Sequence, residues 1–227
     1  MPDNESFQAG GTLTLATNHL VSMATGDKHT DKTGLGRWSA ISFRGKEEKI
    51  FTVLTAYRVC KGNIQSSSVG SAYSREHIYH RNNDNKSPQP RKIFLQDITQ
   101  TIKTLQSAGH AILLMLDSNG SLDDDDDLKT LLIDCELNDL HQQSPAPSTY
   151  IGANNRRIDH ILGCHHTTTA MKASGSLSYI DGPQSDHRGL FVDLDLQHLL
   201  QKTLLGSTIP TASMRNLKSV NPESVEA

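Results

Sequence analysis

Three short polar motifs lie where apolar runs end, and each contains a carboxylate in a position that suits chemistry. The first is L-D-S-N-G, in which Asp117 and Asn119 directly follow the apolar run A-I-L-L-M-L. A carboxylate can bind a metal ion or orient a water, and an amide can hydrogen-bond a phosphoryl oxygen. The alternative is an ordinary Asx turn, because Asp, Ser, Asn and Gly are common turn residues. Taken alone, the motif favours the turn.

The second and third motifs contain a second carboxylate and a histidine. In R-R-I-D-H-I-L, Asp159 interrupts an apolar strand, where a buried carboxylate needs a partner and a histidine from another strand would suit. In S-D-H-R-G-L, Asp186 is a hard metal ligand beside His187, which can exchange protons near neutral pH. The alternatives are a water-facing Asp159 and a simple polar turn.

The surrounding pattern predicts the elements that must position these motifs. Apolar alternation and continuous apolar runs indicate strands, and helical spacing of Ile and Leu indicates helices. The strands are expected at 12–16, 38–43, 49–57, 111–116, 157–162, 171–180 and 189–196, with a hairpin between the second and third. Helices are expected at 73–81, 91–107 and 128–135, the last beginning at the acidic residues 123–127. Mixed helices and strands with hairpins favour a layered α/β sandwich over a doubly wound sheet.

The order of the three motifs resembles the endonuclease/exonuclease/phosphatase superfamily, which has the deoxyribonuclease-I-like fold. Two more segments match in order: T-A-Y-R at 55–58 resembles the family's strand-end tyrosine, and S-T-Y at 148–150 its Thr–aromatic pair. The resemblance covers residues 10–196. The segments G-L-G-R-W (34–38), Y-R-V-C (57–60) and R-N-L-K-S-V-N-P (215–222) are similar to endonucleases of retroelement polyproteins.

The resemblance implies a fold and an activity. The fold would be a four-layer α/β sandwich, two packed mixed β-sheets with outer helices, incomplete at the N-terminus. The activity would be hydrolysis of a phosphodiester in nucleic acid, with DNA the first choice, by a His/Asp-activated water and a divalent metal. Hard oxygen ligands suit Mg²⁺ or Mn²⁺.

The resemblance also implies a role for each matching residue. His187 would act as general base or contact the phosphate, and Asp159 would orient it. Asp117 would align the attacking water, and Asn119 would bind the phosphate. The remaining roles fall to Asp186 as metal ligand, Tyr57 at the phosphate or leaving group, and Arg58, with Arg156 and Arg157 as further candidates, at the phosphate.

One part of the family pattern does not match. A strand-end Asn and a metal-ligating Glu should precede the first expected strand by a few dozen residues, but only nine residues precede Gly10. The alternatives are therefore a catalytically impaired chain that acts as a binding or interaction domain, or a phosphatase for a small phosphoester.

Bulk composition limits the remaining possibilities. A net charge of −3 lacks the broad positive surface of a general nucleic-acid binder, although a local basic cleft remains compatible with it. The cysteines Cys60, Cys135 and Cys164 are too sparse for a disulfide framework, which favours an intracellular location, the nucleus included, over secretion. No apolar run approaches the ~20 residues of a membrane span, and no oligomer is predicted. The expected division is a disordered start (1–9), one domain (10–196) and a tail or linker (197–227).

Overall fold

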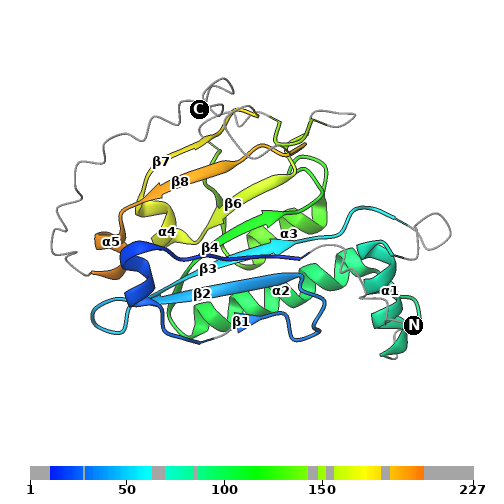
Figure 1. Cartoon of the computed structure of the whole chain (residues 1–227), viewed down its shortest axis with the longest axis horizontal. Helices are drawn as coiled ribbons and strands as arrows, with labels where there is room; N and C mark the ends of the chain where they lie inside the picture. Colours follow the sequence, from blue (N-terminus) through cyan, green and yellow to red (C-terminus); the bar gives the residue numbers. More distant parts are fainter. Residues whose placement is uncertain are drawn as a thin grey trace, which may run out of the picture.

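The computed structural model describes residues 11–27, 29–62, 70–83, 86–142, 148–151, 156–179 and 185–201. Two sheets and several helices build the described part of the chain (Figure 1). The larger sheet has six strands in the order β1 (His29–Thr30), β2 (Trp38–Arg44), β3 (Ile50–Tyr57), β4 (His110–Asp117), β6 (Asp159–Gly163) and β5 (Asn138–Asp139). The smaller sheet pairs β7 (Met171–Ser176) with β8 (Leu190–Leu194). The helices are η1 (Asn18–Met23), α1 (Ala72–Asn82), α2 (Pro90–Ser107), α3 (Asp126–Asp134), α4 (His165–Thr169) and α5 (Leu196–Leu200).

The larger sheet is mixed, because β3 and β4 run parallel while its other neighbouring strands are antiparallel. The parallel pair requires a crossover, and α1 and α2 supply it. The hairpin predicted at 38–43 and 49–57 is confirmed as β2 and β3. The predicted α/β architecture, a mixed sheet with a second sheet and helices around them, is therefore confirmed.

The core lies on the sheet face that meets the apolar stripe of α2. Side chains of alternate strand residues point to the same face, and on this face Leu54, Leu114 and Leu162 are fully buried. Phe94 and Ile98 of α2 join the same cluster and are equally buried. Each fully buried side chain of this kind contributes roughly 1.5–3 kcal/mol of hydrophobic stabilisation. The packing of α2 against the larger sheet therefore stabilises the strands that carry the candidate site.

The segment predicted as a strand at 12–16 is not a strand, and that prediction was wrong. The segment contacts β2 and β3 through side-chain hydrogen bonds. The Thr14 hydroxyl donates to Thr55 Oγ1 at 2.9 Å and lies 3.1 Å from Ser39 Oγ. Leu13 and Leu15 are 71% and 75% exposed, so alternation here does not reflect a buried ladder. Among the described residues, no backbone partner pairs with the segment.

The packed core continues past residue 196 into α5. Leu199 and Leu200 are buried, and the Lys46 amide donates to the Leu200 carbonyl at 2.9 Å. Gly45 is required at this contact, because a Cβ there would lie 2.1 Å from the Leu200 oxygen. The start of the predicted tail thus packs on the β2–β3 turn, whereas 202–227 and the expected disordered start at 1–9 lie outside the described residues. No described helix combines the length and apolarity needed to cross a membrane.

Candidate active site

Strand register places three of the predicted site residues in one row across the larger sheet. Tyr57, the last residue of β3, pairs with Asp117, the last residue of β4, in parallel register. Asp117 in turn pairs with Asp159, the first residue of β6, in antiparallel register. Directly paired residues point to the same face of a sheet, so the phenol and both carboxylates meet at the end of these strands. The strands β3, β4 and β6 lie side by side in the sheet (Figure 1).

His187 joins this row from the segment that precedes β8. Its ring Nδ1 lies 2.9 Å from Asp159 Oδ2, so Asp159 has a histidine partner of the kind that a carboxylate in an apolar strand requires. The ring also lies beside Tyr150, with ring centroids 5.2 Å apart. A backbone bridge between Tyr150 and His187 keeps the two segments together.

Thr149 fixes the carboxylate side of this pair. Its hydroxyl oxygen accepts the backbone N–H groups of Ile158 and Asp159 at 3.0 and 3.1 Å. Its carbonyl accepts the Arg188 amide at 2.7 Å. Thr149 is fully buried, and it therefore ties the start of β6 to the residue that follows His187.

Asn119 lies beside the row in a turn that its own side chain helps to fix. Its backbone is left-handed, with φ 46°, a region that Asn tolerates better than most residues. Its amide N–H donates to Asp117 Oδ1 at 3.1 Å, and its side-chain amide donates to the Arg58 carbonyl at 2.8 Å. The motif thus forms an Asx turn that lies beside the row, so the turn interpretation of D-S-N does not exclude a role at the site.

Burial and charge set the protonation behaviour of the site. Burial, followed by the charge of Asp159, raises the pKa of Asp117 to about 6. Burial alone would lower the pKa of His187, but the charge and hydrogen bond of Asp159, with the charges of Asp117 and Asp186, outweigh it, and the net pKa is raised. Burial, then the Cys60 thiol and Asp117, raises the pKa of Tyr57, which keeps its hydroxyl protonated as a donor.

A divalent cation fits the donor set at this corner. One donor atom each of Asp117, Asp159 and His187 lie within 4.8 Å of one another. Asp117 has no ion-pair partner among the described residues, so apart from the hydrogen bond that its Oδ1 accepts from the Asn119 amide, its lone pairs are available. Asp186, the predicted metal ligand, is exposed and lies outside this group of three, although its charge helps to raise the pKa of His187. No glutamate from the described residues joins the group.

Two of the three arginines predicted at the phosphate are paired with carboxylates instead. Arg58 is buried, and its guanidinium donates to Asp125 Oδ2 at 2.7 Å. Arg157 makes a two-pronged ion pair with Asp139 at 2.7 and 2.6 Å. Arg156 is exposed. Phosphate binding by Arg58 and Arg157 stays a prediction. The carboxylates that neutralise their charges do not favour it.

Two residues near the site were missed by sequence reasoning. The Cys60 thiol donates to Asn119 Oδ1 at 3.1 Å and lies near the Tyr57 hydroxyl. Arg91, at the start of α2, donates to the carbonyls of Val59 and Asn119 and so connects the two loops that carry the site. Cys60 lies in the segment Y-R-V-C, which ends three residues after Tyr57 and could have indicated it. No local pattern indicated Arg91.

Comparison with solved structures identifies the fold of the chain. A 3' phosphatase from Neisseria, NExo, solved with a product DNA hairpin, matches at a TM-score of 0.51 and 16% identity, covering 75% of this chain and 71% of that one. The AP endonuclease LMAP from Leishmania major matches at a TM-score of 0.50 and 10% identity, covering 69% of this chain and 54% of that one. The chain has the endonuclease/exonuclease/phosphatase fold.

Other comparisons are weaker. The endonuclease domain of TRAS1, a telomere-specific non-LTR retrotransposon, matches at a TM-score of 0.46 and 14% identity, covering 75% of this chain and 69% of that one. This likeness does not bear on the retroelement branch, which stays a prediction. No family model matches the sequence, and no curated protein matches it significantly. The chain spans between 54% and 71% of the length of the three structures named here.

Proposed function

We propose that this chain is a divalent-metal-dependent phosphodiester hydrolase of nucleic acid, with DNA as the first candidate substrate. The observation that carries the proposal is the group of Asp117, Asp159 and His187, whose donor atoms lie within 4.8 Å of one another at the ends of paired strands. The fold, shared with nucleases and a phosphatase, supports it. The slightly acidic net charge is compatible, because a local basic surface can steer an anionic substrate.

In this proposal His187 is the general base. In the tautomer that this role requires, the Nδ1–H group of His187 donates a hydrogen bond to Asp159 Oδ2 at 2.9 Å, which leaves Nε2 with a lone pair that can take a proton from water. Asp117 orients the attacking water, and Asn119 donates a hydrogen bond to a phosphoryl oxygen. Tyr57 stays protonated and donates to the phosphate or the leaving group.

Mg²⁺ or Mn²⁺ would be held by carboxylates at this corner, Asp117 with Asp159 or Asp186. Hard oxygen donors of this kind suit both ions. When bound, the cation supplies electrostatic stabilisation of the charge that develops on the phosphoryl group and the leaving oxygen. The raised pKa of Asp117 supports this assignment, because a cation there would relieve the unfavourable burial of its charge.

A plasmid-nicking assay with Mg²⁺ tests the proposal. Replacing His187 with Ala should lower the rate about 10²–10⁴-fold, the usual contribution of a general base. The exposed His165 of α4 offers a matched control, and His165→Ala should nick at the wild-type rate. Equal, background-level nicking by the wild type and His187→Ala would refute the activity.

A binding or interaction domain without catalysis is the second candidate. It is favoured by one observation, that no glutamate from the described residues joins the Asp117 group. Calorimetry would then find no Mg²⁺ affinity while DNA or protein binding persists. Robust metal-dependent turnover would exclude this candidate, and release of phosphate from a monoester alone would instead indicate a phosphatase for a small phosphoester.

A further inference from the structure

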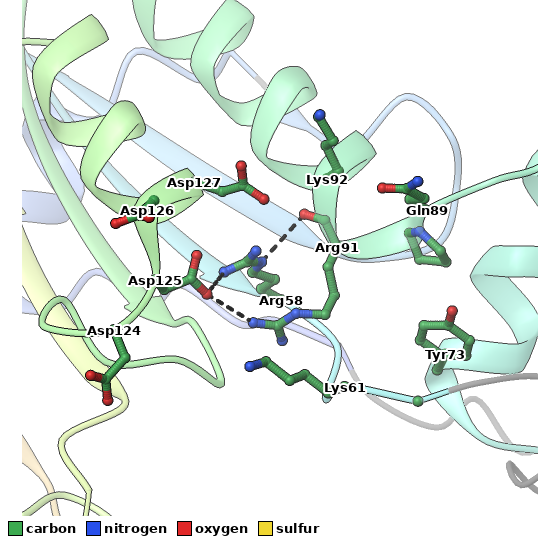
Figure 2. Close-up of a pocket in the computed structure, with 12 residues that line it drawn as sticks. Arg58, Lys61, Tyr73, Gln89, Arg91, Lys92, Asp124, Asp125, Asp126 and Asp127 are labelled. Carbon is green, nitrogen blue, oxygen red and sulfur yellow. Dashed lines mark hydrogen bonds and ion pairs between the residues drawn. The ribbon is translucent and has the colours of Figure 1, made fainter.

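A second hollow lies next to the candidate active site and is here called the Tyr73 pocket. Its volume is about 480 Å³, within the range of roughly 300–1,000 Å³ that is usual for small-ligand sites. The start of α2, the segment after β3, α1 and the entry to α3 surround it. The side chains that matter for its chemistry are Arg58, Lys61, Tyr73, Arg91, Asp125 and Asp127 (Figure 2).

Two residues that line the pocket contact Asn119, the residue to which the phosphate is assigned. The Arg91 guanidinium donates to the Asn119 carbonyl at 3.3 Å. The Asn119 side-chain amide donates to the Arg58 carbonyl at 2.8 Å. Asn119 is therefore in direct contact with two of the residues that line the pocket.

Two guanidinium groups share one carboxylate in the pocket. Asp125 Oδ2 accepts from Arg58 at 2.7 Å and from Arg91 at 3.2 Å (Figure 2). Burial, followed by the charge of Arg58, lowers the pKa of Arg91, while the charge and hydrogen bond of Asp125 oppose this effect. Lys61 extends toward the same side and has no ion-pair partner among the described residues.

The acidic residues of the rim do not cancel this excess. Asp124 turns away from the two guanidinium groups (Figure 2), and Asp126 is paired with Lys129 at 3.0 Å. Lys92 also points away. Among the side chains that face inward, Arg58, Lys61 and Arg91 carry three positive charges against the two negative charges of Asp125 and Asp127, a net charge of +1. This balance favours an anionic group such as a phosphate.

Tyr73 gives the pocket an aromatic surface at its other end. Its ring, on α1, lies across from the Arg91 side chain and away from Asp125 (Figure 2). The side chain is only partly buried, so one part of the ring is accessible. An accessible aromatic ring beside basic groups is the arrangement on which proteins stack unpaired bases while they hold the phosphate backbone.

We propose that the Tyr73 pocket binds an unpaired nucleotide that neighbours the phosphodiester at Asn119, with its base on Tyr73 and its phosphate at Lys61. The inference rests on the proposed function for the identity of the polymer. A base inside a duplex is already stacked on both faces, so the pocket selects single-stranded segments or frayed ends over intact duplex.

Fluorescence anisotropy without metal tests the site separately from hydrolysis. The probes are a labelled single strand of about eight nucleotides, the span of one single-strand site, and the blunt duplex of the same sequence, both in EDTA. Wild type should bind the single strand at least about fivefold more tightly than the duplex. Tyr73→Ala should weaken single-strand binding about 5- to 150-fold, the range for one stacked base, whereas Tyr73→Phe should retain it.

Matched variants separate the pocket from the general surface. Tyr79→Ala removes a tyrosine from the same helix that does not line the pocket, and it should bind like wild type. Lys61→Ala should reduce the slope of log affinity against log salt by about one phosphate contact. Lys103→Ala, on α2 and away from the pocket, should not change that slope.

The outcomes distinguish this site from the proposed activity. Unchanged single-strand binding by correctly folded Tyr73→Ala, or equal affinity for single strand and duplex, overturns the inference. A wild type that never nicks DNA but binds single strands through Tyr73 refutes the hydrolase and leaves the pocket standing. Nicking that depends on His187, together with single-strand binding that Tyr73→Ala does not change, refutes the pocket and leaves the hydrolase standing.

Discussion

Two groups of charged side chains in this molecule contain similar residues and behave in opposite ways. At one, Arg37 donates to both oxygens of Asp31 at 2.7 and 3.0 Å and to Asp97 at 2.7 Å. At the other, Asp117 and Asp159 meet His187 at the strand ends. The Arg37 side chain in the first group is 1% exposed, whereas the side chains of His187 and Asp159 in the second are 31% and 20% exposed.

The difference shows what separates a structural carboxylate from a reactive one. Burial pushes the pKa of both Asp31 and Asp117 upward. Hydrogen bonds from Arg37 and Thr33 reverse this effect, and the net pKa of Asp31 is lowered. Asp117 accepts the Asn119 backbone N–H but no guanidinium among the described residues, and its pKa stays at about 6. Asp31 therefore contributes to stability, while Asp117 keeps an affinity for a proton or a cation.

Removing the guanidinium tests this comparison most severely. Arg37→Met leaves Asp31 buried without its partner, and breaking a buried pair from one side costs about 3–5 kcal/mol. Urea denaturation should show that loss in the free energy of unfolding. Arg44→Met, on an exposed position of β2, should cost less than about 0.5 kcal/mol. A loss of the same small size in Arg37→Met would remove the structural role from this group.

Glu76 offers a pH test of the same region. Burial raises its pKa to about 7 from 4.5, an effect that Arg37 opposes and that Asp31 and Asp97 reinforce. A raised folded-state pKa means that the stabilisation is complete below pH 4.5 and is lost as the pH rises through about 7. Glu76→Gln should remove this loss, which at roughly 1.4 kcal/mol per pH unit is at most about 3 kcal/mol.

Thermal or urea unfolding between pH 4.5 and 8 measures the Glu76 effect. The exposed Glu136 is the control, and Glu136→Gln should leave the pH dependence of the wild type unchanged. If Glu76→Gln and the wild type lose stability in parallel over this range, Glu76 does not titrate as proposed.

Magnesium should act on the open group alone, and with the smallest effect. About 10 mM Mg²⁺ at a dissociation constant near 1 mM would stabilise the wild type by about 1.4 kcal/mol. The gain should fall as the pH drops below about 6, because protons then compete for Asp117. Asp117→Asn should lose the gain, whereas Asp97→Asn should keep it. Equal Mg²⁺ stabilisation of both variants in differential scanning fluorimetry would place the cation elsewhere.

Local patterns were sufficient for much of the fold and for the membership of the candidate site. The alternation in β2 and β3, the continuous apolar run of β4 and the helical spacing of α2 are properties of short segments, so they could be identified without the rest of the chain. Motif order, through its resemblance to a known superfamily, indicated that Asp117, Asp159 and His187 belong together. Alternation predicted a strand wrongly at 12–16, where no strand of the described chain pairs with the backbone of the segment.

The partners of the charged groups were decided only in three dimensions. The resemblance assigned Arg58 to a phosphate, but Asp125, 67 residues away in the sequence, accepts its hydrogen bond at 2.7 Å and neutralises it. Arg37 and Asp97, 60 residues apart, are likewise adjacent. Electrostatic roles depend on distance and burial rather than on sequence spacing. The sequence by itself therefore determined which residue types are available for chemistry, whereas the tertiary structure decided which are neutralised and which stay free to react.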